Sequence, residues 1–82
     1  MINVSNDVYN DAAAITTSDT DNHVWTFDAF HVGGAGTVVV VLENAVTVTL
    51  VGCLAGNVYR LRGIRINATS TTATNLVGLR YK

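Results

Sequence analysis

Residues 37–42, with the sequence TVVVVL, restrict the fold of this chain more than any other segment. Valine is branched at Cβ, which favours strands and disfavours helices. Turn-forming residues stand on both sides, with three glycines within residues 33–36 and Glu43-Asn44-Ala45 after the segment. A short segment that is apolar on both faces and bounded by turns is typical of a strand covered on both sides. We therefore expect a central β-strand here.

The next segment, residues 46–50, alternates between apolar and polar residues. Val46, Val48 and Leu50 share one face, as expected for a strand with that face toward the core. Asn44 tolerates the left-handed backbone that a tight turn requires. The two segments together predict a β-hairpin.

Three further segments, residues 24–32, 58–67 and 76–81, also have the composition of strands. Within residues 58–67 the alternation slips by one position across Arg62-Gly63, which predicts a β-bulge. Short strands at this spacing, with no helix between them, predict an all-β fold. We expect a small antiparallel sandwich or jelly-roll-like barrel of five or six strands.

Residues 1–22 differ from the rest of the chain. They contain four of its six acidic residues and show no sustained period of either kind. We expect an extended N-terminal arm over residues 1–22, which is ordered only where it docks on another surface, and a β-domain over residues 23–82.

The size and composition favour self-association. A chain of 82 residues has a thin margin of stability, and its single cysteine, Cys53, excludes an internal disulfide. Apolar residues make up 49% of the chain and charged residues only 13%, about half the usual share. Subunit contacts would bury the excess apolar surface. No segment is long and apolar enough for a membrane span, and we expect no membrane partner.

The charges are divided along the chain. All acidic residues lie within residues 1–43 and all basic residues within residues 60–82. This division suits either contact between two copies or neutralisation within one subunit, and both interpretations stay open. Arg60, Arg62 and Arg65 form the sharpest charged feature, and we expect at least one to pair with a carboxylate across a subunit boundary.

Other motifs carry little chemistry. The glycines of residues 33–36 lack the lysine of a phosphate-binding loop, so a tight turn is expected. Asp19, Asp21 and His23 lack the further ligands of a calcium loop, and we expect no metal or cofactor. No serine stands in a catalytic elbow, so no enzyme is expected. A sequence pI of about 6.0 does not favour nucleic acid.

A little over half of the chain, residues 32–79, resembles the small spike base proteins of phage heads and gene transfer agents. The matching motifs are Val32-Gly33-Gly34-Ala35-Gly36 with the valine strand, Val46-Thr47-Val48-Thr49, Gly52, Ala55-Gly56, the arginine-bearing strand, and Asn67-Ala68-Thr69 with the threonine-rich segment after it. The chain departs from the family pattern at Leu54, where proline is usual, and at Glu43-Asn44, where Asp-Gly is common.

The resemblance implies an oligomeric, non-catalytic virion protein, either a spike base or a decoration (cement) subunit on the capsid surface, assembled in the host cytoplasm. Its implied partners are itself, as a trimer or pentamer, the major capsid protein, and a spike or fibre protein. We expect the subunit or capsid interface to include Asp7, Tyr9, Asp11, Asp19, Asp21, Arg60, Arg62 and Arg65. The alternative is a small carbohydrate- or ligand-binding β-module, with Trp25, Tyr59 and Tyr81 as contact residues.

Overall fold

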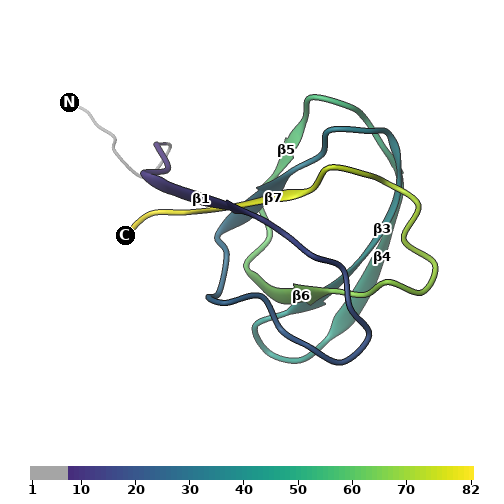
Figure 1. Ribbon diagram of the computed structural model, residues 1–82, viewed down its shortest axis with the longest axis horizontal. Coiled ribbons are helices and arrows are strands. Elements are labelled where there is room, and N and C mark those ends of the chain that lie inside the picture. The colour runs from purple at the N-terminus through teal and green to yellow at the C-terminus, as the bar shows by residue number, and fades with distance from the viewer. Residues whose placement is uncertain (1–7) are drawn as a thin grey trace.

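The computed structural model describes residues 8–82, which form two antiparallel sheets and contain no helix (Figure 1). The strands are β1 (Asp11–Ala14), β2 (Ala29–His31), β3 (Gly36–Leu42), β4 (Thr47–Cys53), β5 (Val58–Tyr59), β6 (Gly63–Ile66) and β7 (Val77–Arg80). The four-stranded sheet has the order β1-β7-β2-β5, and the three-stranded sheet has the order β4-β3-β6. The prediction of a small all-β sandwich is confirmed, with seven described strands in place of five or six.

Strand β3 lies in the middle of its sheet, as its sequence predicts. Val38 and Val40 are fully buried in the core between the sheets. Val39 and Val41 alternate with them, so they point to the other face, and they are also buried. The hairpin with β4 is confirmed, with Val40 opposite Val48.

The hairpin turn differs from the prediction in one residue. Ala45, and not Asn44, has the left-handed backbone, with a φ of 71°. The Ala45 N–H donates to the Leu42 carbonyl (2.8 Å), and the Val46 N–H donates to the Asn44 side-chain oxygen (3.2 Å). This is the three-residue loop in which the third residue adopts the left-handed conformation. The asparagine stabilises the turn through its side chain instead of its own backbone angle.

Residues 58–67 form two strands and not the single strand that was predicted. Strand β5 pairs with β2 in one sheet, and β6 pairs with β3 in the other. The predicted irregularity is present, because Leu42 lies opposite Gly63 while Val41 lies opposite Arg65, which leaves one residue extra. The slip in the alternation therefore marks the place where the chain passes from one sheet to the other.

The predicted strand over residues 24–32 is also shorter than expected, since only Ala29–His31 form β2. Phe27 instead makes an isolated bridge to Gly63, with N–H to carbonyl distances of 2.9 and 3.0 Å. A Cβ atom on Gly63 would lie 2.6 Å from the fully buried Phe27 ring. Glycine at position 63 is therefore what allows the backbone of β6 to contact this ring.

Replacing Gly63 with alanine should destabilise the fold by about 1–3 kcal/mol, because the added methyl group overpacks the core. Chemical denaturation would measure this change in the free energy of unfolding. The double variant Gly63→Ala/Phe27→Leu is the control, because a smaller side chain at position 27 should recover part of the loss. If the losses of stability caused by the two single substitutions simply add in the double variant, the steric explanation is wrong.

The N-terminal arm is not separate from the β-domain in the described residues. Strand β1 pairs with β7, and Asp11 lies opposite Arg80. Ile15 is only 8% exposed and belongs to the hydrophobic core. The expected division at residue 22 therefore does not match the structure over residues 11–15. Three consecutive alanines in residues 12–14 conceal the alternation of the strand, because both of its faces carry the same small side chain.

Replacing Ile15 with alanine should cost about 2–4 kcal/mol of stability, because it leaves a cavity in the core. The matched control is Val8→Ala, since Val8 is 62% exposed and should change stability by less than about 0.5 kcal/mol. Thermal or urea denaturation would compare the two. If the Ile15 variant is as stable as the Val8 variant, residues 11–15 do not contribute to the core and belong to the expected arm.

Candidate functional site

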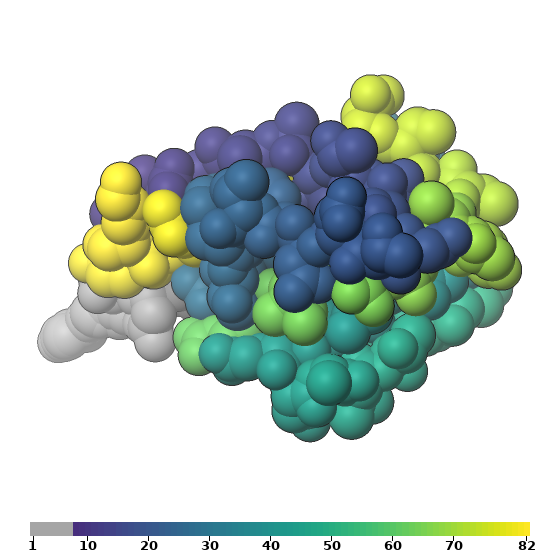
Figure 2. All heavy atoms as spheres, turned by 60° about the horizontal axis from the view of Figure 1, so that its bottom comes forward, coloured from purple at the N-terminus to yellow at the C-terminus, as the bar shows by residue number. Residues whose placement is uncertain are grey.

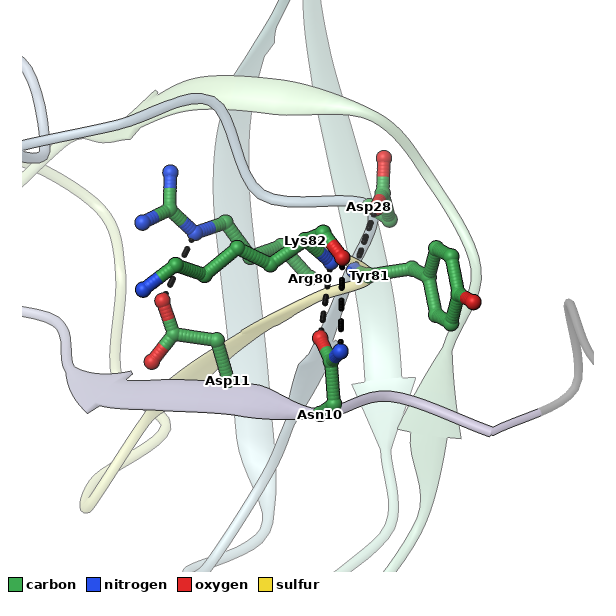
Figure 3. Close-up of polar contacts among 6 residues, drawn as sticks. All are labelled: Asn10, Asp11, Asp28, Arg80, Tyr81 and Lys82. Atoms are coloured by element: carbon green, nitrogen blue, oxygen red, sulfur yellow. Dashed lines mark hydrogen bonds and ion pairs between the residues drawn. The ribbon is translucent and has the colours of Figure 1, made fainter.

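The described N-terminal residues and the C-terminus lie side by side, because β1 and β7 run antiparallel (Figure 1). Figure 3 shows the contacts that join them. The Lys82 N–H donates to the Asn10 side-chain oxygen (2.7 Å), and the Asn10 amide donates back to the Lys82 carbonyl (3.3 Å). These bonds fix residues 10 and 82 at one end of the four-stranded sheet.

Arg80, which lies on β7, links this strand to β1 through its charge. Its Nε donates to Asp11 Oδ2 at 2.8 Å, and this hydrogen bond from Arg80 holds the pKa of the Asp11 carboxyl below its usual value. The guanidinium carbon also lies 4.3 Å from the centre of the Trp25 ring, a cation–π contact. Arg80 therefore neutralises an acidic residue of β1 and covers an aromatic ring at the same time.

Asp28 binds both the C-terminal segment and Arg62. Its Oδ2 accepts the Tyr81 N–H (2.9 Å), and its Oδ1 accepts Arg62 Nε (3.1 Å) and lies 3.0 Å from Arg62 Nη2. Arg62 Nη1 also lies 3.7 Å from Glu43. Asp28 thus ties the C-terminal segment to the crossover between β5 and β6.

These contacts shape a surface hollow of about 450 Å³. It is lined by Tyr9, Asp28, Arg60, Arg62 and Tyr81, which we call the Tyr–Arg hollow. Tyrosine and arginine are enriched among the residues that dominate binding energy at protein interfaces. Two guanidinium groups and two phenol groups can bind carboxylates and backbone carbonyls of a partner protein. The side chains of the hollow are therefore of the types that recognise a partner protein.

The structure brings together only part of the interface that the sequence predicts. Tyr9, Arg60 and Arg62 line the hollow, whereas Asp11 is not among its lining residues and pairs with Arg80. Asp19 binds Thr69, and Arg65 donates to Asn22 and Asn67, so both have other partners. Asp21 borders a separate shallow depression with His23, and Asp7 lies outside the described residues.

Two lining residues were not in the predicted interface, Asp28 and Tyr81. No local pattern reveals them, because each reaches the hollow only through pairing with strands far away in the sequence. Tyr81 was expected only as a contact of the alternative binding module, and it is 55% exposed in the structure. Which residues line the hollow therefore depends on the order of the strands in the sheets, and local periodicity does not predict that order.

The opposite charges of the two halves meet within one subunit. Arg80 pairs with Asp11, and Arg62 pairs with Asp28 and Glu43. This is the second of the two interpretations that the sequence leaves open. The Arg62 guanidinium turns toward carboxylates of its own chain, and the pairing of at least one of the three arginines across a subunit boundary stays a prediction.

His23 does not join a metal site. Its ring packs edge-on against Trp25 (4.6 Å between centres) and Phe27 (6.0 Å), and its Nε2 has no hydrogen-bond partner in the structure. Burial, and then the charge of Arg80, lower the pKa of the His23 imidazole. Within residues 8–82, no three histidine, cysteine or acidic side chains gather as metal ligands would.

Acidification should destabilise the protein through His23. Because its pKa is lower in the folded state than in the unfolded chain (about 6.5), the unfolded state takes up the proton first. The free energy of unfolding should therefore be constant above about pH 7 and decrease as the pH falls below about 6.5. Asp11 and Asp19, whose pKa values are also lowered, contribute only at more acidic pH.

Urea denaturation across this range would test the expectation. His23→Phe should flatten the pH dependence, while the control His31→Gln should retain it. A His23→Phe variant that loses stability on acidification as the parent does would assign the effect to another group.

The aromatic residues of the alternative binding module do not share an open face. Trp25 is covered by Arg80, and Tyr59 stacks on Phe30 at 5.6 Å while its hydroxyl accepts the Leu54 N–H (2.8 Å). Tyr81 alone of the three is strongly exposed. In the described part of the chain, no helix is long and apolar enough to cross a membrane.

The fold is that of a small β protein with two antiparallel sheets, and its hollow is lined by tyrosine, arginine and aspartate side chains. No protein-family model and no curated protein matches the sequence. Among solved structures, the chain is similar to a chain from the capsid of a native GTA (gene transfer agent) particle, computed with C5 symmetry. The two are 34% identical, with 95% of this chain and 92% of the other covered and a TM-score of 0.82. This chain belongs to the same family as that capsid component.

Proposed function

We propose that this protein is a structural, non-enzymatic subunit of a phage-type capsid, attached to the capsid surface as an oligomeric spike base or decoration subunit. The observation that carries the proposal is the similarity to a chain of a gene transfer agent capsid over nearly the whole length of both chains. At 34% identity the likeness extends beyond a shared fold. The location that follows is the virion, after assembly in the host cytoplasm.

The composition supports attachment and self-association as a trimer or pentamer. Exposed large apolar side chains are numerous for so small a domain: Val8, Val24, Val46, Val51, Leu54, Val58 and Tyr81. Burying such surface against other subunits removes it from water, which is favourable by about 25 cal/mol per Å². The proposed partners are further copies, the major capsid protein and a spike or fibre protein.

The Tyr–Arg hollow is the proposed contact with the capsid shell. It combines Tyr9 and Tyr81 from the two ends of the described chain with Arg60 and Arg62 from the crossover. Arg62 is held by Asp28, so its orientation is set before a partner binds. An acidic segment of the capsid protein would fit this hollow. The ligand-binding module is less well supported, because Trp25 and Tyr59 are engaged within the domain.

Replacing Arg60 with glutamine should weaken binding to capsid shells that lack this protein, by roughly tenfold or more if Arg60 is an interface hot spot. Co-sedimentation with the shells would measure the bound fraction. Arg65→Gln is the matched control, because it removes the same charge at a residue outside the hollow. Added salt should weaken binding of the parent but change the binding of Arg60→Gln less.

If Arg60→Gln and Arg65→Gln bind capsid shells equally well, the hollow is not the contact with the shell. Failure of the parent protein to bind any capsid shell would count against the proposed function itself.

A further inference from the structure

Residues 54–58, where the chain passes from β4 to β5, present aliphatic side chains at one edge of the four-stranded sheet. The order of that sheet places β5 at one edge and β1 at the other. Leu54 is 60% exposed, and Val58, the first residue of β5, is 43% exposed. We call residues 54–58 the apolar turn, because water contacts a large aliphatic side chain at each of its ends.

The apolar turn is held in a fixed shape by backbone contacts. The Leu54 N–H donates to the Tyr59 hydroxyl (2.8 Å), and the Asn57 N–H donates to the Leu54 carbonyl (3.3 Å). The Gly56 N–H donates to the Val32 carbonyl (2.7 Å), and the Val32 N–H donates to the Asn57 carbonyl (3.0 Å). A segment whose backbone is already ordered loses little conformational entropy when a partner binds it.

A shallow depression of about 290 Å³ lies beside β1, at the opposite edge of the same sheet. Its aliphatic lining residues are Ala13, Ala14 and Val24, and Val24 is 82% exposed. Asp21 is the one charged side chain among the lining residues. In Figure 2 the purple atoms of β1 and the blue atoms of the segment before β2 lie side by side on the surface. We call this surface the β1 depression.

The apolar turn and the β1 depression lie on opposite sides of the molecule. Figure 1 shows the passage from β4 to β5 at the top and the chain between β1 and β2 at the bottom. One copy can therefore offer its turn to one neighbour and its depression to another. A contact between two different surfaces repeats from copy to copy and closes a ring when the rotation is right. A trimer or pentamer requires a contact of this kind.

We infer that the apolar turn of one copy packs into the β1 depression of the next copy, head to tail around a ring. Leu54 and Val58 bring aliphatic surface, and the small side chains of Ala13 and Ala14 leave room for it. Burying these groups together removes apolar surface of both copies from water. Neither Leu54 nor Val58 carries a charge that would have to be desolvated in the contact.

This inference deepens the self-association of the proposed function and rests on it. It names the two surfaces through which the copies meet. The Tyr–Arg hollow shares no residue with the apolar turn or with the β1 depression. A subunit in the ring therefore keeps its hollow available for the capsid shell.

The first test is the oligomeric state of full-length variants at micromolar concentrations, by light scattering on a sizing column. Leu54→Asp should lower the association constant at least tenfold, because it buries a carboxylate in an apolar contact that already holds Asp21. Val46→Asp is the matched control, since Val46 is 50% exposed and belongs to neither surface. It should associate as the parent does. Circular dichroism would confirm that both variants are folded.

A mixing experiment tests whether the contact joins two different surfaces. Leu54→Asp alters the turn and leaves the depression intact, whereas Val24→Asp alters the depression and leaves the turn intact. Each variant alone should be monomeric. Their mixture should form dimers and nothing larger, because one intact turn meets one intact depression and the two remaining surfaces are both altered.

Three outcomes would overturn the inference. They are association of Leu54→Asp equal to that of the parent, a mixture of the two variants that stays monomeric, and a parent protein that is monomeric in solution. If the monomeric parent still binds capsid shells, the ring contact is wrong and the capsid role stands. If the ring forms and the variants behave as expected but no shell is bound, the contact is supported and the capsid role is wrong.

Discussion

The bridge between Phe27 and Gly63 is the constraint on which the rest of the fold depends. It joins the segment before β2 in one sheet to the start of β6 in the other, with both backbone hydrogen bonds formed. The Phe27 ring is fully buried and stands edge-on to Phe30, which in turn stacks on Tyr59. Because the domain is small, this row of rings makes up much of its core, and the two sheets close around it.

The crossover that Gly63 permits also places two residues of the Tyr–Arg hollow. Arg60 and Arg62 lie between β5 and β6, where the chain passes from one sheet to the other. Asp28, one residue beyond Phe27, therefore comes within 3.0 Å of Arg62. The hollow is thus a consequence of the close contact in the core, and its charged residues are oriented by the strands that meet there.

Sequence reasoning predicts the parts of this protein that depend on local pattern. The valine strand, the hairpin and the irregularity at Gly63 follow from periodicity and turn residues. Strand β1 could not be predicted, because its alanines give no contrast between faces and its stability comes from pairing with β7 at the other end of the chain. For the same reason Asp28 and Tyr81 were absent from the predicted interface, although they line the hollow together with the predicted residues Tyr9 and Arg60.

The use of charge explains why much of the remaining surface is uncharged. The pairs of Arg80 with Asp11 and of Arg62 with Asp28 use scarce charges to fasten the chain ends and the crossover. With charged residues at only 13% of the chain, few remain to cover the hairpin. An uncharged edge is a liability in a monomer, since it promotes pairing with other strands. The charges therefore hold the fold together, and β4, the outermost strand of its sheet, carries none.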